Sequence, residues 1–127
     1  MLKALFIWAP PLIYVPIIFI LSIRPMPESI PGNMDKVIHL LVYSIVGVIF
    51  TRALMRGIKI KNSTTTIALA LLFSIALGTL IEIVQYFIPY RSASLGDIAA
   101  NSAGALIGVY LYTFIAKSNK GQSHASS

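Results

Sequence analysis

The sequence contains no cysteine, and only four of its 127 residues are acidic. Without cysteine, the chain can have no disulfide framework, no thiolate metal site and no thiol nucleophile. Charged residues make up 11% of the sequence, compared with roughly 25% in soluble domains. Hydrophobic residues make up 57%, and the mean hydropathy is +0.82. We therefore predict an integral membrane protein rather than a small soluble domain.

The chain carries a net charge of +6, which by itself would suit a nucleic-acid partner. It lacks, however, a basic stripe with interleaved aromatic residues, and most of its Lys and Arg residues flank the ends of apolar segments. Cations in those positions fix the topology of a membrane protein. We therefore predict no nucleic-acid partner. Since the sequence has no recognisable cofactor-binding loop, we also predict no cofactor.

Four apolar runs are each long enough to cross a hydrocarbon core of ~30 Å as a helix that rises ~1.5 Å per residue. They cover approximately residues 5–23, 35–54, 66–88 and 95–116. The predicted fold class is therefore all-α, with a single domain of four transmembrane helices over residues 1–116. Residues 117–127 are polar and rich in serine, and we expect them to form a disordered cytoplasmic tail.

The first apolar run contains Pro10, Pro11 and Pro16. Each proline lacks the backbone donor that would bond to the carbonyl four residues earlier. Because unsatisfied backbone groups are costly in a bilayer, we expect neighbouring helices to supply donors to the freed carbonyls. No small-x-small cleavage site follows this run, so we expect it to remain uncleaved.

The segment between the second and third runs is short and basic. It carries Arg52, Arg56, Lys59 and Lys61 but no acid. Such a segment is typically cytoplasmic. With the four spans as predicted, seven of the ten cations lie on this side of the membrane. We therefore predict a multi-pass membrane protein with both termini cytoplasmic, so that the four acids lie on the outer side or in the outer half of the membrane.

Polar side chains recur at helical spacing inside the last three runs, where such residues are rare and usually functional. The sets are Asp35, Lys36, His39 and Tyr43 in the second run, Gly78, Glu82 and Gln85 in the third, and Asp97, Asn101, Gly104 and Gly108 in the fourth. Residues three, four or seven positions apart share one helix face. The third and fourth runs are joined by a short loop, so we expect their polar faces to converge near it.

Two interpretations fit these polar residues: a structural network that holds the helices together, or a functional site. Interhelical hydrogen bonds in membranes contribute only ~0.6 kcal/mol on average. That is little return for embedding so many polar groups, so we favour a functional site. The candidate ligand-binding residues are Asp35, Lys36, His39, Tyr43, Glu82, Gln85, Arg91, Ser94, Asp97 and Asn101.

A metal site would draw on the same residues, because Asp35, His39, Glu82 and Asp97 are all ligand types. The spacing gives it little support, since no HxxxH or ExxH pair occurs on one helix and His124 lies in the polar tail. We therefore predict no metal site.

Acid–base catalysis is a further alternative, for which Glu82, Asp97 and His39 are the candidate catalytic residues. Lys36 or Arg91 would then stabilise an oxyanion. No nucleophile motif supports such a reaction, because the serines of the connecting loop are better explained as loop and N-cap residues. The sequence therefore leaves open whether the protein is an enzyme.

Gly104 and Gly108 have the spacing of small residues that let two membrane helices approach closely. The partner helix could belong to a second copy of the chain, which would give a homo-oligomer. Alternatively, it could belong to the same chain, which would make the glycines part of the intramolecular packing.

Together, these residues resemble the VanZ-like family of small multi-pass bacterial membrane proteins. The resemblance rests on three patterns: Asp35-Lys36-x-x-His39 with Tyr43, Gly78-x-x-x-Glu82-x-x-Gln85-x-Phe87-x-Pro89-x-Arg91, and Ser94-x-x-Asp97-x-x-x-Asn101-x-x-Gly104. The family takes its name from an accessory factor in resistance to the glycopeptide teicoplanin. The resemblance therefore implies a role at the cell envelope and a lowered susceptibility to glycopeptides.

Two functions of different classes follow from these residues. In the first, Arg91 and Lys36 hold an anionic group of a membrane lipid or cell-wall precursor, while Glu82, Gln85 and Asn101 accept its hydrogen bonds. In the second, a membrane-embedded enzyme acts on such a headgroup by acid–base catalysis. We favour binding, because the sequence offers recognition groups without a nucleophile, a metal motif or a cofactor loop.

Overall fold

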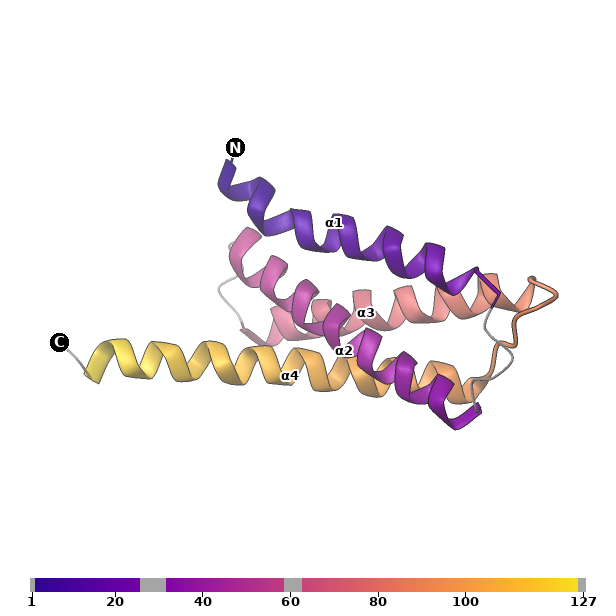
Figure 1. Cartoon of the computed structure of the whole chain (residues 1–127). Helices are drawn as coiled ribbons and strands as arrows, with labels where there is room; N and C mark the ends of the chain where they lie inside the picture. Colours follow the sequence, from indigo (N-terminus) through magenta and orange to yellow (C-terminus); the bar gives the residue numbers. More distant parts are fainter. Residues whose placement is uncertain (1, 26–31, 59–62, 126–127) are drawn as a thin grey trace.

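The computed structural model describes residues 2–25, 32–58 and 63–125 of the chain. These residues form four helices and no strand: α1 (Leu2–Ser22), α2 (Gly32–Gly57), α3 (Ser63–Tyr86) and α4 (Leu95–Ala125), shown in Figure 1. Each helix is long and apolar enough to cross a membrane. The predicted all-α fold with four transmembrane helices is therefore confirmed.

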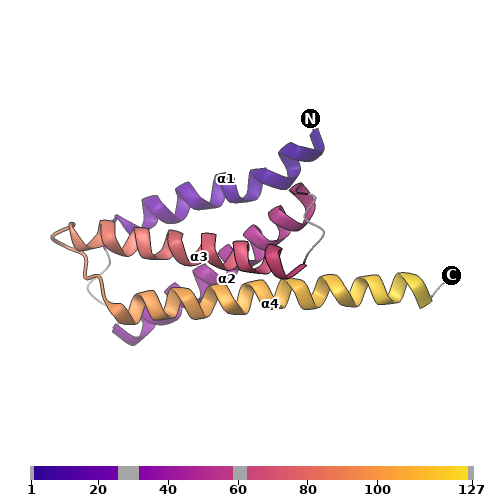
Figure 2. The same cartoon turned by 180° about the vertical axis from the view of Figure 1, so that it is seen from behind.

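The helices run alternately up and down, so that both chain termini lie at one end of the bundle (Figures 1 and 2). The end of α1, the beginning of α2, the end of α3 and the beginning of α4 gather at the opposite end. We call this second end the polar end, because it carries the predicted polar residues. The termini lie together, as an even number of spans requires.

Seven of the eight helix ends differ from the predicted boundaries, six of them by one to three residues. Two of the differences have local reasons. α3 ends at Tyr86, before the predicted residue 88, because Phe87 and Ile88 donate to carbonyls only three residues earlier, and Pro89 follows with no backbone donor. α4 continues past Ala116 to Ala125, so residues 117–125 are helical where we expected disorder. That segment contains no proline to stop the helix.

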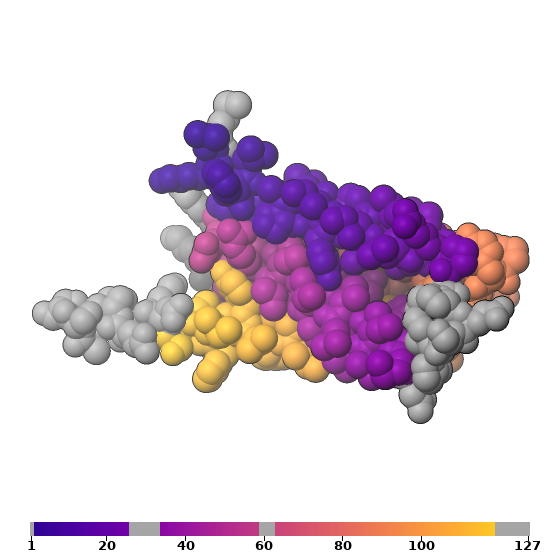
Figure 3. Space-filling model, viewed as in Figure 1, coloured from indigo at the N-terminus to yellow at the C-terminus, as the bar shows by residue number. Residues whose placement is uncertain are grey.

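The outward-facing side chains of the bundle are largely apolar. Leu12 is 68% exposed, Leu72 62% and Phe114 74%. Figure 3 shows one face of this surface, formed by α1, α2 and part of α4. A helix that is apolar all round belongs in lipid, so these exposed side chains fit a bundle surrounded by a bilayer.

α2 and α4 make the most extensive helix–helix contact, and glycines let their backbones approach closely. A Cβ atom at Gly104 would collide with the carbonyl oxygen of Leu40, and one at Gly108 with that of Ser44. Gly47 on α2 has the reciprocal role, since a Cβ there would lie 2.5 Å from a carbonyl oxygen of α4. Gly104 and Gly108 therefore pack within the chain. A homo-oligomer would need a different surface from the glycine motif considered above.

α1 is attached in a different way, and in its first half a side chain of α2 holds it. Pro10 and Pro11 cannot donate to the carbonyls of Phe6 and Ile7, four residues earlier. Arg52 of α2 donates its Nη1 to these same two carbonyl oxygens, at 3.4 and 3.5 Å. The predicted supply of donors by a neighbouring helix is confirmed at this point.

Candidate functional site

Five polar residues meet inside the polar end, where α2, α3 and α4 come together. They are Asp35 and His39 of α2, Glu82 of α3, and Asp97 and Asn101 of α4. We call them the polar cluster. All except Asp35 are at most 9% exposed. The predicted convergence of the polar faces of α3 and α4 is therefore found in the structure, and α2 contributes a third face.

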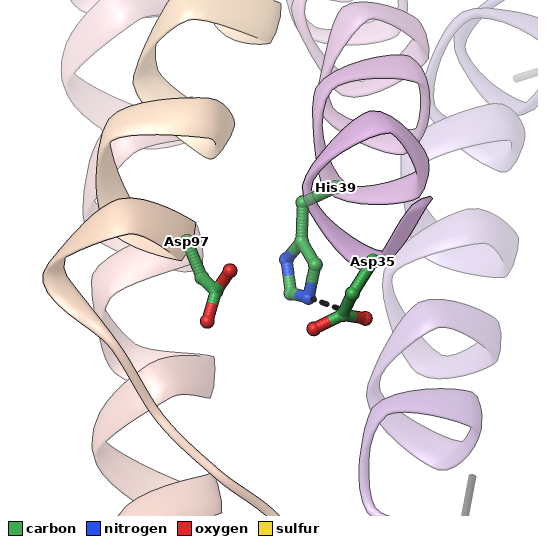
Figure 4. Close-up of side chains that lie close together, drawn as sticks. All are labelled: Asp35, His39 and Asp97. Atoms are coloured by element: carbon green, nitrogen blue, oxygen red, sulfur yellow. Dashed lines mark ion pairs between the residues drawn. The ribbon is translucent and has the colours of Figure 1, made fainter. Parts of the chain in front are cut away.

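The imidazole of His39 is at the centre of the polar cluster. Its Nδ1 lies 2.9 Å from Asn101 Oδ1 and 3.5 Å from Glu82 Oε1. The Asn101 amide Nδ2 also donates to Glu82 Oε1, at 3.4 Å. Because an amide oxygen can only accept, Nδ1 of His39 carries the hydrogen. The other ring nitrogen, Nε2, faces Asp35 Oδ1 at 3.7 Å (Figure 4).

Asp97 is held in place by the cap of its own helix. Ser94 Oγ accepts a hydrogen bond from the backbone N of Asp97 at 3.1 Å and donates to Asp97 Oδ2 at 2.6 Å. Ser94 is therefore the N-cap of α4, as predicted, and a carboxylate in the first turn is favourable to the helix dipole. The second oxygen, Asp97 Oδ1, is buried and has no hydrogen-bond partner.

Three successive carbonyls at the end of α1 accept hydrogen bonds from side chains of α3 and the loop that follows it. Gln85 Nε2 donates to Ser22 O at 2.9 Å, Tyr90 OH to Ile23 O at 3.0 Å, and Arg91 Nη1 to Arg24 O at 3.5 Å. Gln85 thus caps α1 instead of facing the polar cluster. Tyr90 was not predicted, although a tyrosine at the end of a span is typical of the membrane interface.

A cavity of about 140 Å³ lies between α1 and α2 at the polar end. Its polar lining consists of Ser22, Asp35, His39, Tyr43 and Arg91. Three of these residues have a buried atom without a hydrogen-bond partner: Asp35 Oδ1, Tyr43 OH and Arg91 Nε. Unpartnered polar atoms are uncommon in folded proteins and require an explanation. Here, all three belong to the lining of one cavity.

A larger cleft of about 390 Å³ lies between α3 and α4. Glu82 and Ser94 are its polar residues, and its walls are otherwise mostly apolar, with Tyr86, Phe87 and Leu95 among them. Glu82 Oε2 is buried without a partner. His39 lines the cavity and its neighbour Glu82 lines the cleft, so the polar cluster separates the two spaces.

Lys36 is exposed, and the structure places it over the beginning of α4 rather than in either space. A Cβ atom at Gly96 would lie 2.8 Å from Lys36 Cε and 3.8 Å from its Nζ. Lys36 and Arg91 were predicted to hold one anion together, but only Arg91 lines the cavity. Lys36 is next to Asp35 in the sequence of α2, but adjacent residues of a helix point in different directions. The Lys36 side chain therefore points toward α4.

Gly78 leaves room for the polar cluster on α3. A Cβ atom there would lie 3.0 Å from Asn101 Cβ and 3.0 Å from Tyr43 Cε1. Ala70, Ser74, Gly78 and Glu82 are all buried, as expected from the small-residue spacing on this helix. The missing side chain of Gly78 therefore lets Tyr43 and Asn101 lie beside α3.

The sequence matches the family model described as VanZ/LLP1 over residues 5–116. This range includes the polar cluster, Arg91 and the greater part of every helix. Searches of curated proteins and of solved structures gave no match.

Proposed function

We propose a function from the premise that this chain belongs to the VanZ/LLP1 family. In this proposal the protein lies in the bacterial cell membrane with its polar end outward. The cavity between α1 and α2 binds the anionic headgroup of a membrane lipid or of a lipid-linked cell-wall precursor. Occupation or shielding of that group at the cell surface would lower susceptibility to glycopeptides such as teicoplanin.

The orientation is supported by the cations of the described residues. Lys3, Arg52, Arg56 and Lys117 belong to the end of the bundle with the termini, whereas the polar end has Arg24, Lys36 and Arg91. The excess of cations marks the cytoplasmic side. A reporter fused after residue 61 should read as cytoplasmic and one inserted at residue 93 as external. An external signal at residue 61 would reverse the orientation and the proposed side of action.

The observation that carries the proposal is that three residues of the cavity lining each have a buried polar atom without a hydrogen-bond partner. Arg91 Nε and Tyr43 OH are donors, and Asp35 Oδ1 is an acceptor. An anionic oxygen would take the two donors, and a hydroxyl or amine of the same headgroup would meet the acceptor. Hydrogen bonds to ionised groups contribute about 1.5–3 kcal/mol each, and more is lost when a buried group is left unpaired.

The size of the cavity limits what can enter. One water molecule needs about 10–15 Å³ of cavity volume, so a volume of about 140 Å³ accommodates a phosphate, a carboxylate or a similar group. A whole sugar–peptide headgroup does not fit. The remainder of the ligand would therefore stay outside the cavity, in the membrane or at its surface.

The test is native mass spectrometry of the full chain in mild detergent, with the retained lipids identified. We expect an anionic lipid or precursor on the wild-type protein and an occupancy at least tenfold lower in Arg91→Ala. Arg52→Ala is the matched control, because Arg52 also donates to α1 carbonyls but at the opposite end of the bundle. Equal loss in both variants would show that α1 attachment, rather than an anion site, had been disturbed.

Tyr43→Phe provides a finer test of the same site. It removes a hydroxyl that has no partner within the protein, so thermal stability should not fall, while ligand occupancy should. The wild type is then expressed in a susceptible host and teicoplanin susceptibility is measured. A lowered susceptibility would connect ligand binding to an effect at the cell envelope. Unchanged occupancy in both Tyr43→Phe and Arg91→Ala would refute binding in this cavity.

An enzyme acting on a lipid or precursor headgroup is the alternative, and one observation favours it. Glu82 Oε2 is buried, unpartnered and part of the cleft between α3 and α4, where a lipid would meet a carboxyl group inside mostly apolar walls. Conversion of the retained lipid by the wild type, abolished by Glu82→Gln or Asp97→Asn, would establish catalysis. Retention of an unaltered lipid supports binding.

A further inference from the structure

We propose that Asp35, His39 and Asp97 form a binding site for a divalent cation. Each residue offers one ligand atom, and these atoms all lie within 4.8 Å of one another. Figure 4 shows the imidazole between the two carboxylates, one from α2 and one from α4. Asp35 and His39 also line the cavity between α1 and α2, so a bound ion would take the place of the headgroup's hydroxyl or amine at Asp35 Oδ1. The site does not use the donors of Arg91 and Tyr43, and this inference does not depend on the proposed lipid ligand.

The tautomer of His39 gives the first argument. Because Nδ1 donates to Asn101 Oδ1, the neutral ring has its lone pair on Nε2, which faces Asp35. A lone pair directed at the Asp35 carboxylate is repulsive unless a positive charge lies between them. Metal-binding histidines commonly donate their other ring nitrogen to an oxygen that fixes the tautomer and the ring orientation. Asn101 occupies that position here.

A proton on Nε2 would also supply positive charge, but the distances favour a larger occupant. Charge-assisted N–H···O bonds are about 2.7–2.9 Å long, whereas His39 Nε2 and Asp35 Oδ1 are 3.7 Å apart. Two ligands that each lie ~2.1 Å from one metal ion are separated by up to about 4.2 Å. The observed separation therefore matches two ligands of one ion better than a direct hydrogen bond.

The unpartnered oxygens give an independent argument. Asp97 is 3% exposed, yet its Oδ1 has no hydrogen-bond partner, and neither has Asp35 Oδ1. The hydrogen bond from Ser94 holds the other Asp97 oxygen. A buried carboxylate oxygen without a partner is costly. A cation coordinated by both of these oxygens would remove that cost.

The donor set indicates the class of cation. One imidazole nitrogen with two carboxylate oxygens suits Zn²⁺ or Mn²⁺, whereas Mg²⁺ and Ca²⁺ prefer oxygen ligands alone. Three protein ligands leave at least one coordination position open. This proposal departs from our expectation of no metal site, which rested on residue spacing within single helices. The proposed ligands come from two helices, and only Asp35 and His39 lie on the same one.

The test uses the full chain in detergent, stripped of metal with a chelator and titrated with Zn²⁺ or Mn²⁺ alone. We expect one ion per chain by calorimetry and elemental analysis. The affinity should fall at least tenfold in Asp97→Asn and in Asp35→Asn. Asp35 is the more exposed of the two carboxylates, so its variant should keep the fold even if Asp97→Asn does not. Size-exclusion and circular-dichroism profiles would verify this.

Electron spin-echo spectroscopy of bound Mn²⁺ provides a direct readout of the histidine. A nitrogen coupling should be present in the wild type and absent in His39→Gln. His124→Gln is the matched control, because it removes the other histidine, which lies near the opposite end of α4, and should change nothing. Stoichiometric binding that is unaffected by both aspartate variants, or no binding below about millimolar concentration, would overturn the proposal.

Discussion

The α2–α4 interface and the attachment of α1 hold membrane helices together by different means. α4 approaches α2 so closely that glycine is needed at Gly47, Gly104 and Gly108. α1 is instead held by long side chains, with Arg52 and Arg91 donating to its carbonyls near its two ends. Backbone contact fixes the distance between two helices. A guanidinium on a flexible side chain can instead stay bonded to a helix when that helix shifts moderately.

This difference extends to the candidate functional site. His39 of α2 and Asp97 and Asn101 of α4 lie on either side of the glycine interface, so the positions of the cation ligands are set by rigid packing. The cavity with Arg91 lies between α1 and α2, where the contacts are more adaptable. We infer that the polar cluster keeps its geometry while the cavity can adjust to the group it holds.

The largest effect is expected from breaking the glycine interface with Gly108→Leu. The new side chain would collide with the Ser44 backbone, which cannot move without separating the helices. Overpacking against side chains costs about 1–3 kcal/mol, so we expect a loss of at least ~3 kcal/mol in detergent unfolding, together with loss of Zn²⁺ binding. Gly96→Ala is the control, because the nearest neighbour of a Cβ there is the flexible end of the Lys36 side chain, and Ser94 Oγ lies at an ordinary contact distance of 3.4 Å. Equal stability of the two variants would contradict the glycine assignment.

A smaller effect is expected at the end of the same interface, from Ser94→Ala. The change removes the N-cap of α4 and the hydrogen bond to Asp97 Oδ2. Loss of a cap costs about 0.5–2 kcal/mol, which should appear as a lower unfolding temperature. Ser94→Thr retains the hydroxyl and should restore most of the stability. If Thr failed where Ser succeeds, the hydroxyl would not be the stabilising group.

The smallest effect is expected from Arg52→Ala, which loosens α1. The two bonds to Phe6 and Ile7 are long, at 3.4 and 3.5 Å, so we expect a loss of only about 0.5–1 kcal/mol. Amide exchange should increase in the first half of α1 and remain unchanged in α4. In a Pro10→Ala, Pro11→Ala background the helix can bond these carbonyls itself. The effect of Arg52→Ala should then shrink, and an undiminished effect would refute the pairing.

The sequence was sufficient to predict the fold class, because hydropathy and length alone identify four spans. It also predicted which residues of α3 and α4 share a buried face, since Glu82, Asp97 and Asn101 follow the helical period. The Ser94 cap was predictable for a similar reason. Each of these features depends on contacts within one helix or on the average environment of a helix.

The relations between helices were not predictable in the same way. Spacing could not show that Gly104 and Gly108 pack on α2 of the same chain, because a glycine motif is equally suited to a second copy. Nor could it show that Lys36 turns toward α4 while Arg91 lines the cavity. These features depend on how each helix is rotated about its axis. That rotation is set by the packing of all four helices together.

α4 has 31 residues and is therefore ~46 Å long at ~1.5 Å per residue, whereas the hydrocarbon core is ~30 Å thick. Its last turns must project into water as a stiff rod that continues the axis of the span. A small tilt about the glycine contacts with α2 therefore becomes a sideways displacement of several ångströms at the tip. A probe attached at the end of α4 would therefore be held away from the bilayer surface by the helix. Its position would change with the tilt of α4, the helix that carries Asp97.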